Sequence, residues 1–211
     1  MQLGAPAVAQ INLAVQPILN CQAGGSCEGG EPEGVYQFMR KTGLPDQTCQ
    51  QYLAKDPARA SCDPIQICET CSPSNSSFSP GTCAVVKTYP AWKVKEFGQV
   101  SGLDQIKAEL VARGPIGAGM MVTSRFENYA GGIYKEQTGP IQINHEISIV
   151  GYGETSTGEE YLICRNSWGT AWGSEGFFYM TTDESRNLGI TTEGDWAVPD
   201  ITQAHLDAFR A

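Results

Sequence analysis

The sequence predicts an α+β protein built in two parts, and three features of the chain indicate this. Apolar residues make up 41% of the 211 residues, which is enough for a packed core. Seven of the eight cysteines lie within the first 83 residues. After Cys83 the chain consists of short apolar or alternating segments separated by Gly, Ser and Thr, as is typical of strands. We expect residues 1–83 to form a helical, disulfide-rich domain and residues 84–211 a mainly antiparallel sheet or barrel.

The first part contains one clear helix pattern. The segment EPEGVYQFMRKTG, residues 31–43, has a proline near its start and a glycine at its end, and it carries Val35, Phe38 and Met39 on one face. Residues 44–83 show little periodicity and hold five cysteines. Disulfides rather than a hydrophobic core should therefore order this stretch.

The second part combines one helix with four strands. The segment GLDQIKAELVARGP, residues 102–115, predicts a helix that Asp104 can cap and that Gly114-Pro115 ends. Its apolar stripe consists of Ile106, Leu110 and Val111. The expected strands are residues 116–122, 146–153, 160–168 and 176–182. The helix should lie on the flank of the sheet that these strands form.

Charge and composition exclude several kinds of partner. The net charge is -9 and the pI about 4.7, so phosphates of nucleic acid or acidic lipid would be repelled. The sequence has no run of ~18 apolar residues, and we expect no membrane span. Its N-terminus lacks the basic region of a signal peptide. No motif calls for a cofactor.

The crowded cysteines have two interpretations. Together with an N-glycosylation sequon at Asn75, they favour the oxidising secretory pathway. The alternative is a zinc site, with the C-x2-C pair as a ligand knuckle. A zinc ribbon would need a second close pair, which the spacing does not supply, so we expect no metal. The cysteines of the zinc alternative are Cys62, Cys68, Cys71 and Cys83.

His145 and Asn166 form a candidate catalytic pair. His145 precedes a strand, and Asn166 ends one and is followed by Ser167-Trp168-Gly169. An asparagine oxygen can accept a hydrogen bond from one imidazole nitrogen, which leaves the other nitrogen to face a nucleophile. Trp168 could shield this hydrogen bond from water. A lone histidine beside a strand is more often structural, and spacing alone does not bring the two residues together.

Several blocks, in order, resemble the papain-like cysteine peptidases. NHEISIVGYG and RNSWGTAWGSEGFF are similar to the family's His and Asn blocks. LAVQPILNC, GSCEGGEPEGVYQF, ARGPIGAGM and FENYAGGIY resemble further blocks, and TGLPDQTCQQYLAKD followed by CETC resembles the cathepsin X (or Z) group. The resemblance covers about residues 11–199. It implies a papain-like two-lobe fold, here with an incomplete helical left lobe and an antiparallel, β-barrel-like right lobe.

The resemblance also implies roles for individual residues. His145 matches the general base, Asn166 the residue that orients it, and Trp168 the indole over the pair. Gly29 and Gly30 match the turn whose backbone pairs with an extended peptide substrate, where a side chain would block the approach.

The implied activity is hydrolysis of peptide bonds through a thioester. The cathepsin X group acts as a carboxypeptidase, so the resemblance implies trimming of C-terminal residues from peptides or proteins. Glu146 stands near the expected substrate pocket and either alters side-chain preference or pairs locally. A lysosomal or secreted location and an N-terminal propeptide are further implications.

The sequence as given lacks the nucleophile of this family. No C-G-[SA]-C-[WY] block occurs in it. Cys27 stands in GGSC, which is partly similar to this block, but the neighbouring carboxylate of Glu28 would raise its thiol pKa. The resemblance implies that Cys27 is a structural cysteine whose disulfide partner is missing. Cys164 shares a strand face with Asn166, yet YLIC is typical of buried core, where a free cysteine behaves as a small hydrophobe.

The other six cysteines are paired by the family pattern. The resemblance implies the bridges Cys21–Cys62, Cys49–Cys68 and Cys71–Cys83, although six cysteines by themselves permit 15 connectivities.

Two explanations of the missing nucleophile remain open. The first is an active peptidase whose N-terminal part, with the catalytic helix, is absent from this sequence. The alternative is a catalytically dead papain-like protein that binds peptides. Losing the catalytic helix would cost ~2–5 kcal/mol for each large buried side chain, against a total stability of ~5–15 kcal/mol. Residues 11–43 show no sign of compensating repacking, so we favour the first explanation.

Overall fold

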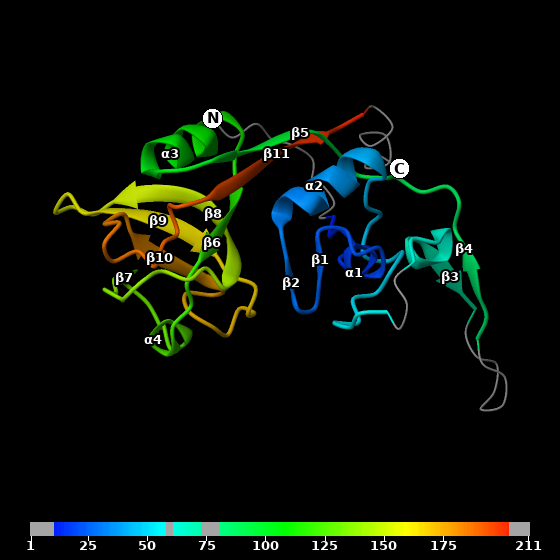
Figure 1. Ribbon diagram of the computed structural model, residues 1–211, viewed down its shortest axis with the longest axis horizontal. Coiled ribbons are helices and arrows are strands. Elements are labelled where there is room, and N and C mark those ends of the chain that lie inside the picture. The colour runs from blue at the N-terminus through cyan, green and yellow to red at the C-terminus, as the bar shows by residue number, and fades with distance from the viewer. Residues whose placement is uncertain (1–10, 58–60, 73–80, 203–211) are drawn as a thin grey trace. The chain divides into compact units, whose positions relative to one another are not determined.

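The computed structural model describes residues 11–57, 61–72 and 81–202 (Figure 1). The chain divides into two compact units. Unit 1 extends to Glu96 and takes in the chain again from Val198, and unit 2 is Phe97–Ala197. The sequon at Asn75 lies outside the described residues. The two units are mixed α and β, as the sequence predicts.

Unit 1 begins with two helices and a small hairpin. Helix α2 confirms the helix expected over residues 31–43: Pro32 occupies its first turn, and Arg40 and Lys41 stand in its last turn, where cations complement the helix dipole. The remaining regular structure of unit 1 is short, as its weak periodicity indicated. The elements are α1 Gln16–Asn20, β1 Gly25–Ser26, β2 Gly29–Gly30, α2 Pro32–Lys41, the 3-10 helix η1 Pro64–Gln66, β3 Glu69–Cys71 and β4 Cys83–Val85.

Three disulfides staple unit 1. They join Cys21 to Cys62, Cys49 to Cys68 and Cys71 to Cys83, which confirms the pairing implied by the resemblance. All four cysteines of the zinc alternative are therefore bonded to sulfur rather than present as thiolate ligands. Cys27 is free and exposed, and Cys164 is free and buried.

We expect a thiol titration to find two reactive groups per chain after denaturation without reductant. In the native protein only one should react, because Cys164 is fully buried. A C27S variant should then show no reactive thiol in the native state and one after denaturation. Finding eight thiols in the denatured, unreduced chain would contradict the disulfide pattern.

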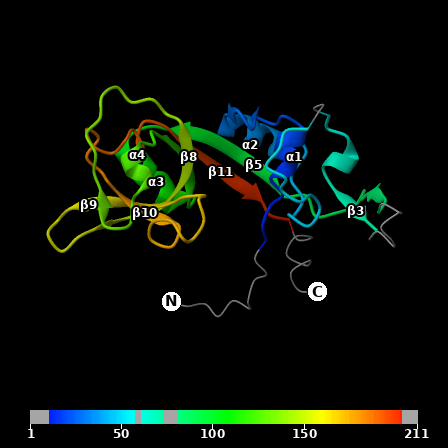
Figure 2. The same ribbon diagram turned by 90° about the horizontal axis from the view of Figure 1, so that it is seen from below.

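Unit 2 contains most of a seven-stranded sheet, of which the first and last strands in the chain extend into residues of unit 1. Its strands are β5 Lys93–Val100, β6 Ile116–Met120, β7 Ile133–Tyr134, β8 His145–Glu154, β9 Glu160–Arg165, β10 Phe177–Thr181 and β11 Gly194–Asp200. They lie in the order β5-β11-β6-β8-β9-β10-β7. Four of them fall on the four predicted strand segments. Figures 1 and 2 show β5 and β11 running side by side at one end of this sheet.

Of the sheet or barrel expected for residues 84–211, the structure shows a sheet that is not closed into a barrel. Over the described residues the sheet is open, with β5 and β7 as its two edges. The β10–β7 pair is moreover parallel, whereas β6, β8, β9 and β10 form an antiparallel series. Closure depends on pairing between strands far apart in the sequence, which the local alternation of side chains does not specify.

Helix α3, Leu103–Ala112, confirms the helix predicted on the flank of the sheet. It packs against β6 and β8, and Ile106 is fully buried in the core. Asp104 was expected to cap this helix, but the N-cap is Gly102, with a φ of 87°, and Asp104 lies in the first turn. There its carboxylate still faces the positive end of the helix dipole. Val111 of the predicted apolar stripe is instead 75% exposed.

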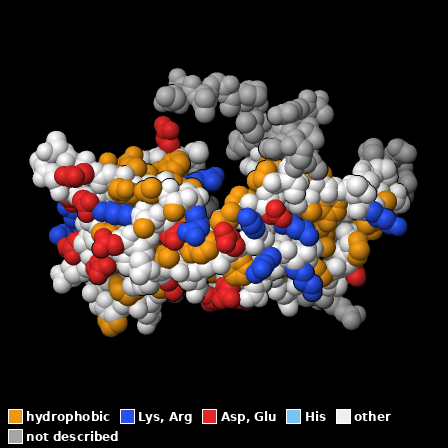
Figure 3. Space-filling view, turned by 90° about the horizontal axis from the view of Figure 1, so that it is seen from above, with side chains coloured by type: hydrophobic (Ala, Val, Ile, Leu, Met, Phe, Trp, Pro, Cys, Tyr) orange, Lys and Arg blue, Asp and Glu red, His pale blue; other side chains and the backbone are white. Residues whose placement is uncertain are grey.

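The surface of the described residues carries charges of both signs. On the face drawn in Figure 3, Lys and Arg side chains occur among Asp and Glu side chains and apolar groups. The described part of the chain includes no helix whose length and hydropathy would suit a membrane span.

Candidate active site

His145 is held at the start of β8 by pairing with β6. His145 stands opposite Met120 in this antiparallel pair. The preceding residue, Asn144, fixes the entry into the strand: its backbone N–H donates to Met120 O at 3.1 Å, and its side-chain Oδ1 accepts from Val122 N at 2.7 Å. Sequence reasoning did not single out Asn144, although an asparagine directly before the histidine is a visible signal.

Asn166 directly follows β9, and the antiparallel β8–β9 pair brings the start of β8 near the end of β9. The two side chains meet: His145 Nε2 lies 2.9 Å from Asn166 Oδ1. Asn166 is buried, and its backbone N–H donates to Gly176 O at 2.9 Å. The contact that spacing alone left open is therefore present.

A third hydrogen bond decides which imidazole nitrogen carries the proton. The backbone N–H of Ser167 donates to Asn166 Oδ1 at 2.8 Å. If the Asn166 amide were flipped, its NH2 group would face the N–H of Ser167, and two donors would meet. The atom of Asn166 that faces both Ser167 and His145 is therefore the acceptor oxygen Oδ1. Nε2 of His145 must then donate. In the neutral imidazole this leaves Nδ1 with a free lone pair, and Nδ1 is the nitrogen able to take a proton.

Trp168 covers the pair. Its ring centroid lies 5.0 Å from that of His145, with the ring planes inclined by 34°. An indole in this position excludes water from one side of the Nε2–Oδ1 hydrogen bond and so strengthens it. Asn166 Nδ2 is buried without a hydrogen-bond partner among the described residues. An unpaired buried donor costs stability and is typically retained at functional sites.

Trp168 packs against an aromatic cluster that consists of Phe126, Tyr134, Trp172 and Phe178. Trp172 packs edge-on against Trp168 with centroids 5.0 Å apart, and Phe126 contacts both indoles. Trp172 Nε1 also donates to Glu127 O at 2.8 Å, which ties the cluster to helix α4, Ser124–Glu127. Sequence reasoning missed Trp172, although its position four residues after Trp168 was a possible signal.

Glu146 points away from His145, because neighbouring residues on a strand face opposite sides of the sheet. It is exposed and pairs in register with Gly119. Carboxylate oxygens of both Glu146 and Glu193 lie over Gly119, where even a Cβ atom would meet them. Ile143 borders the same place. Two acidic groups and an apolar side chain thus converge on one backbone position next to the His145 strand.

Gly29 and Gly30 lie in unit 1 and form the exposed strand β2, which pairs with β1 in a hairpin. Gly29 pairs with Ser26 and Gly30 with Gly25. Gly29 has a φ of 133°, and a Cβ there would have open space around it. The requirement for glycine at this position is therefore conformational.

Neither free cysteine is activated. Partial desolvation, followed by the negative charge of Asp56, raises the pKa of the Cys27 thiol. Both carboxylate oxygens of Asp56 accept from the Cys27 backbone N–H, at 3.0 and 3.1 Å. Burial raises the pKa of the Cys164 thiol well above its ordinary value. A nucleophile needs a lowered thiol pKa, and both shifts have the opposite sign.

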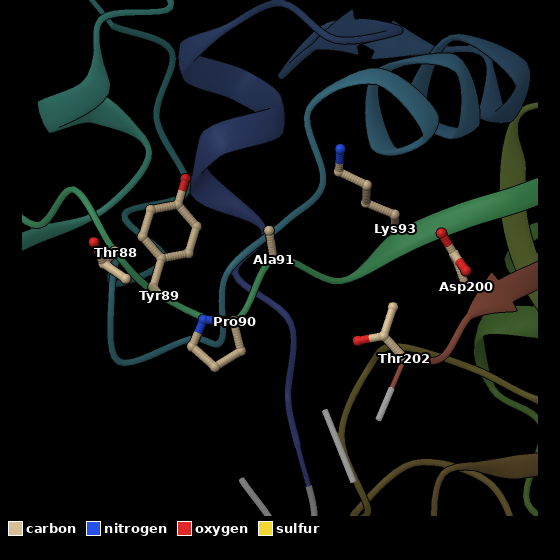
Figure 4. A pocket seen from close by; sticks show the side chains of 7 residues that line it. All are labelled: Thr88, Tyr89, Pro90, Ala91, Lys93, Asp200 and Thr202. Carbon is tan, nitrogen blue, oxygen red and sulfur yellow. The ribbon is translucent and has the colours of Figure 1, made fainter. Parts of the chain in front are cut away.

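A separate cavity of about 490 Å³ lies within unit 1 (Figure 4). Its lining contains neither cysteine nor histidine, and it includes none of the site residues predicted from the sequence. Lys93 and Asp200 are its two charged groups, and Lys93 Nζ donates to Lys41 O at 3.3 Å. The lining is Thr88, Tyr89, Pro90, Ala91, Lys93, Asp200 and Thr202. This cavity therefore offers neither a thiol nor an imidazole for the chemistry of a cysteine peptidase.

Comparison with known proteins shows what the whole chain is similar to. The profile described as papain family cysteine protease matches residues 4–198. The chain is 42% identical over 194 residues to cathepsin Z of Onchocerca volvulus, covering 89% of this chain and 60% of that protein. It is 30% identical over 188 residues to a cathepsin L-like proteinase of Fasciola hepatica, covering 86% of this chain and 50% of the relative. The chain thus spans about half to three fifths of these relatives.

Solved structures agree on the fold. Bromelain from Ananas comosus, in complex with the E64 inhibitor, superposes with a TM-score of 0.65 at 23% identity, covering 89% of this chain and 78% of bromelain. A structure reported in a study of the mite allergens Blo t 1 and Der p 1 gives a TM-score of 0.71 at 22% identity, covering 90% of this chain and 57% of the other.

Proposed function

Because the chain belongs to the papain family of cysteine proteases, we propose that His145 and Asn166 are the general base and its orienting residue in peptide-bond hydrolysis. The observation that carries the proposal is the 2.9 Å contact between His145 Nε2 and Asn166 Oδ1, with Ser167 N–H marking Oδ1 as the acceptor. Trp168 serves as the lid that keeps water from this hydrogen bond.

The mechanism follows from the free lone pair on His145 Nδ1. Nδ1 takes the proton of a cysteine thiol, and the thiolate attacks the carbonyl carbon of the scissile bond. The imidazolium, held by Asn166, then gives the proton to the leaving amine, and a thioester remains. In the second step Nδ1 takes a proton from water, whose oxygen attacks the thioester carbonyl. The C–S bond then breaks to release the carboxylic acid product, and the imidazolium returns the proton to the thiolate. Asn166 Oδ1 accepts from Nε2–H throughout, so the ring keeps its orientation in both protonation states.

The thiol is the group that the described site does not provide. Cys27 and Cys164 both have raised pKa values, and the other six cysteines form disulfides. We therefore propose that the nucleophile belongs to a segment N-terminal to these 211 residues. From the resemblance to the cathepsin X group we also propose a carboxypeptidase that acts on peptides or proteins in a lysosomal or secreted setting and is preceded by a propeptide.

Sequencing the native transcript upstream of Met1 and assaying the encoded protein tests this function. We expect a longer reading frame with a cysteine block of the form C-G-[SA]-C-[WY], and thiol-dependent cleavage of peptides. The 211-residue chain by itself should cleave none. Peptide cleavage by the purified 211-residue chain, blocked by a thiol-directed inhibitor, would overturn the assignment of the nucleophile.

A second candidate function is peptide binding without hydrolysis. The raised pKa values of both free thiols favour it for the chain as it stands, since neither thiol is activated as a nucleophile while the His145–Asn166 contact is formed. A stop codon just ahead of Met1, with protein of this size in the cell, would support this candidate against the first.

Glu146 is proposed to set substrate preference together with Glu193. Both carboxylates lie over Gly119 on the strand pair that carries His145, and their joint negative charge favours a Lys or Arg side chain of the peptide. Ile143 offers an apolar wall for the methylene groups of such a side chain.

We expect Glu146→Gln to lower kcat/KM for substrates with arginine near the scissile bond by up to roughly tenfold, since the amide oxygen can still accept a hydrogen bond but the negative charge that strengthens it is lost. Matched peptides with leucine at the same position should change little. Glu154→Gln, at the far end of the same strand, is the control. An equal loss for the arginine and leucine peptides would contradict a role of Glu146 in preference.

A further inference from the structure

Glu136 is the hub of a hydrogen-bond network beside the aromatic cluster. It follows β7, and its backbone is fixed by a bridge to Asn187 and by an N–H that donates to Arg186 O at 2.9 Å. Its side-chain Oε2 accepts from Thr123 Oγ1 at 2.7 Å and from the hydroxyl of Tyr134. One carboxylate oxygen thus joins two hydroxyl groups from different segments.

Thr123 passes this restraint on to helix α4. It is the N-cap of α4, and its Oγ1 accepts from Phe126 N at 3.1 Å. A hydroxyl has one proton to donate, and in Thr123 that proton goes to Glu136. The lone pairs of Oγ1 are thereby turned toward the N–H of Phe126. A cap whose hydroxyl cannot rotate restrains the short helix more strongly than a free one.

Helix α4 in turn holds both indoles of the site. Phe126 is fully buried and contacts Trp168 at 6.1 Å and Trp172 at 5.3 Å between ring centroids. The carbonyl oxygen of Glu127 accepts from Trp172 Nε1 at 2.8 Å. Since Trp168 lies over His145, a continuous series of contacts leads from the Glu136 carboxylate to the imidazole.

The protonation states agree with this direction of bonding. Burial, and next the hydrogen bond to Glu136, raises the pKa of Tyr134 to about 12, so the Tyr134 hydroxyl keeps its proton and donates it. Arg125 of α4 lies over the Tyr134 ring, with its guanidinium carbon 5.7 Å from the ring centroid, and so contacts the ring whose hydroxyl binds Glu136.

We propose that Glu136 is a positioning residue, which fixes helix α4 through Thr123 and thereby holds the Trp168–Trp172 pair over the His145–Asn166 hydrogen bond. The proposal rests on the proposed function for its catalytic meaning, but the geometry it describes can be measured without any catalysis. Glu136 touches neither His145 nor a reacting atom, and its effect is transmitted by packing.

The test is hydrogen exchange at the Nε2–H of His145, followed by NMR with ¹⁵N-labelled histidine in the full chain. The sequence has two histidines, so an H205Q variant assigns the signals. We expect Glu136→Ala to speed exchange of this proton at least roughly tenfold, because two hydrogen bonds behind the lid are lost. Glu136→Gln keeps an oxygen that can accept from both hydroxyls and should stay within about twofold of wild type.

Glu159→Ala is the matched control. Glu159 forms a surface ion pair with Lys135, the neighbour of Glu136, but has no hydrogen bond to Thr123 or Tyr134. Its removal should leave the exchange rate unchanged. If Glu136→Ala does not fold, Thr123→Val removes the same link at the other partner, and Thr123→Ser restores it. Thr123→Val should then speed exchange and Thr123→Ser should not.

The outcomes separate this inference from the proposed function. Unchanged exchange in Glu136→Ala, or in Thr123→Val, would overturn the positioning role even if the protein hydrolyses peptides. Equal acceleration in Glu136→Ala and Glu136→Gln would also overturn it, because the hydrogen bonds would then not be the cause. Accelerated exchange in Glu136→Ala, in a protein that shows no peptidase activity, would support the positioning role and contradict only the proposed peptide hydrolysis.

Discussion

Replacing His145 with alanine is expected to lower kcat for peptide hydrolysis by on the order of 10⁴-fold or more, in protein that carries the nucleophile. His145 Nδ1 is the base that forms the thiolate, and the imidazolium is the acid that protonates the leaving amine. Losing both roles removes the chemistry and leaves substrate binding, so KM should change much less than kcat. Initial-rate measurements with a fluorogenic peptide check this split.

Asn166→Ala provides the comparison for this variant. The base remains, but Nε2–H loses its acceptor and the ring loses its orientation, so the loss in kcat should be smaller than for His145→Ala. Glu154→Gln, on the same strand as His145, should retain wild-type activity. A His145→Ala protein that keeps its activity within roughly tenfold of wild type would contradict the assignment of the base.

The second large effect concerns stability. Phe126→Ala is expected to lower the free energy of unfolding by about 3–5 kcal/mol, out of a typical total of ~5–15 kcal/mol. Phe126 is fully buried and contacts Tyr134, Phe178 and both indoles, with ring centroids 4.9 to 6.1 Å away. Its removal leaves a cavity in the centre of the aromatic cluster. The shift in the urea unfolding midpoint, with disulfides intact, measures the change.

Val111→Ala is the control for this stability prediction. Val111 is 75% exposed on helix α3, so its truncation should change the free energy of unfolding by less than about 0.5 kcal/mol. A loss below about 1 kcal/mol for Phe126→Ala would show that the cluster collapses around the cavity, contrary to a close-packed support for Trp168.

The sequence predicts the central strands because each is a compact apolar segment with its own boundaries. β6, β8, β9 and β10 lie within or close to the segments expected. β5 and β11 were not predicted, because charged residues and Gly98 interrupt the first, and Asp195 and Pro199 the second. Gly98 of β5 lies so close to the indole of Trp196 on β11 that a Cβ at Gly98 would come within 2.7 Å of it. This packing is between residues distant in the sequence, so no local sequence pattern indicates it.

The site likewise contains residues that a local motif indicates and residues that only contacts between distant segments bring together. His145, Asn166 and Trp168 could be found because they stand in short motifs next to strand ends. Glu136 could not, because an acidic residue directly after a lysine looks like an ordinary surface position. The proposed role of Glu136 depends on its hydrogen bond with Thr123, which lies on another segment, and on the buried packing of Phe126 in the helix that Thr123 caps. Networks that form only in the folded chain are the part of the site that sequence reasoning does not reach.

We propose that His145 and Asn166 serve a cysteine located N-terminal to these 211 residues. The most direct measurement is to label the protein of the full reading frame with a thiol-directed peptidyl inhibitor and to map the adduct by mass spectrometry. We predict one adduct per molecule, on a cysteine upstream of Met1, and its loss in the His145→Ala variant. An adduct on Cys27 or Cys164, or undiminished labelling of His145→Ala, would contradict the account.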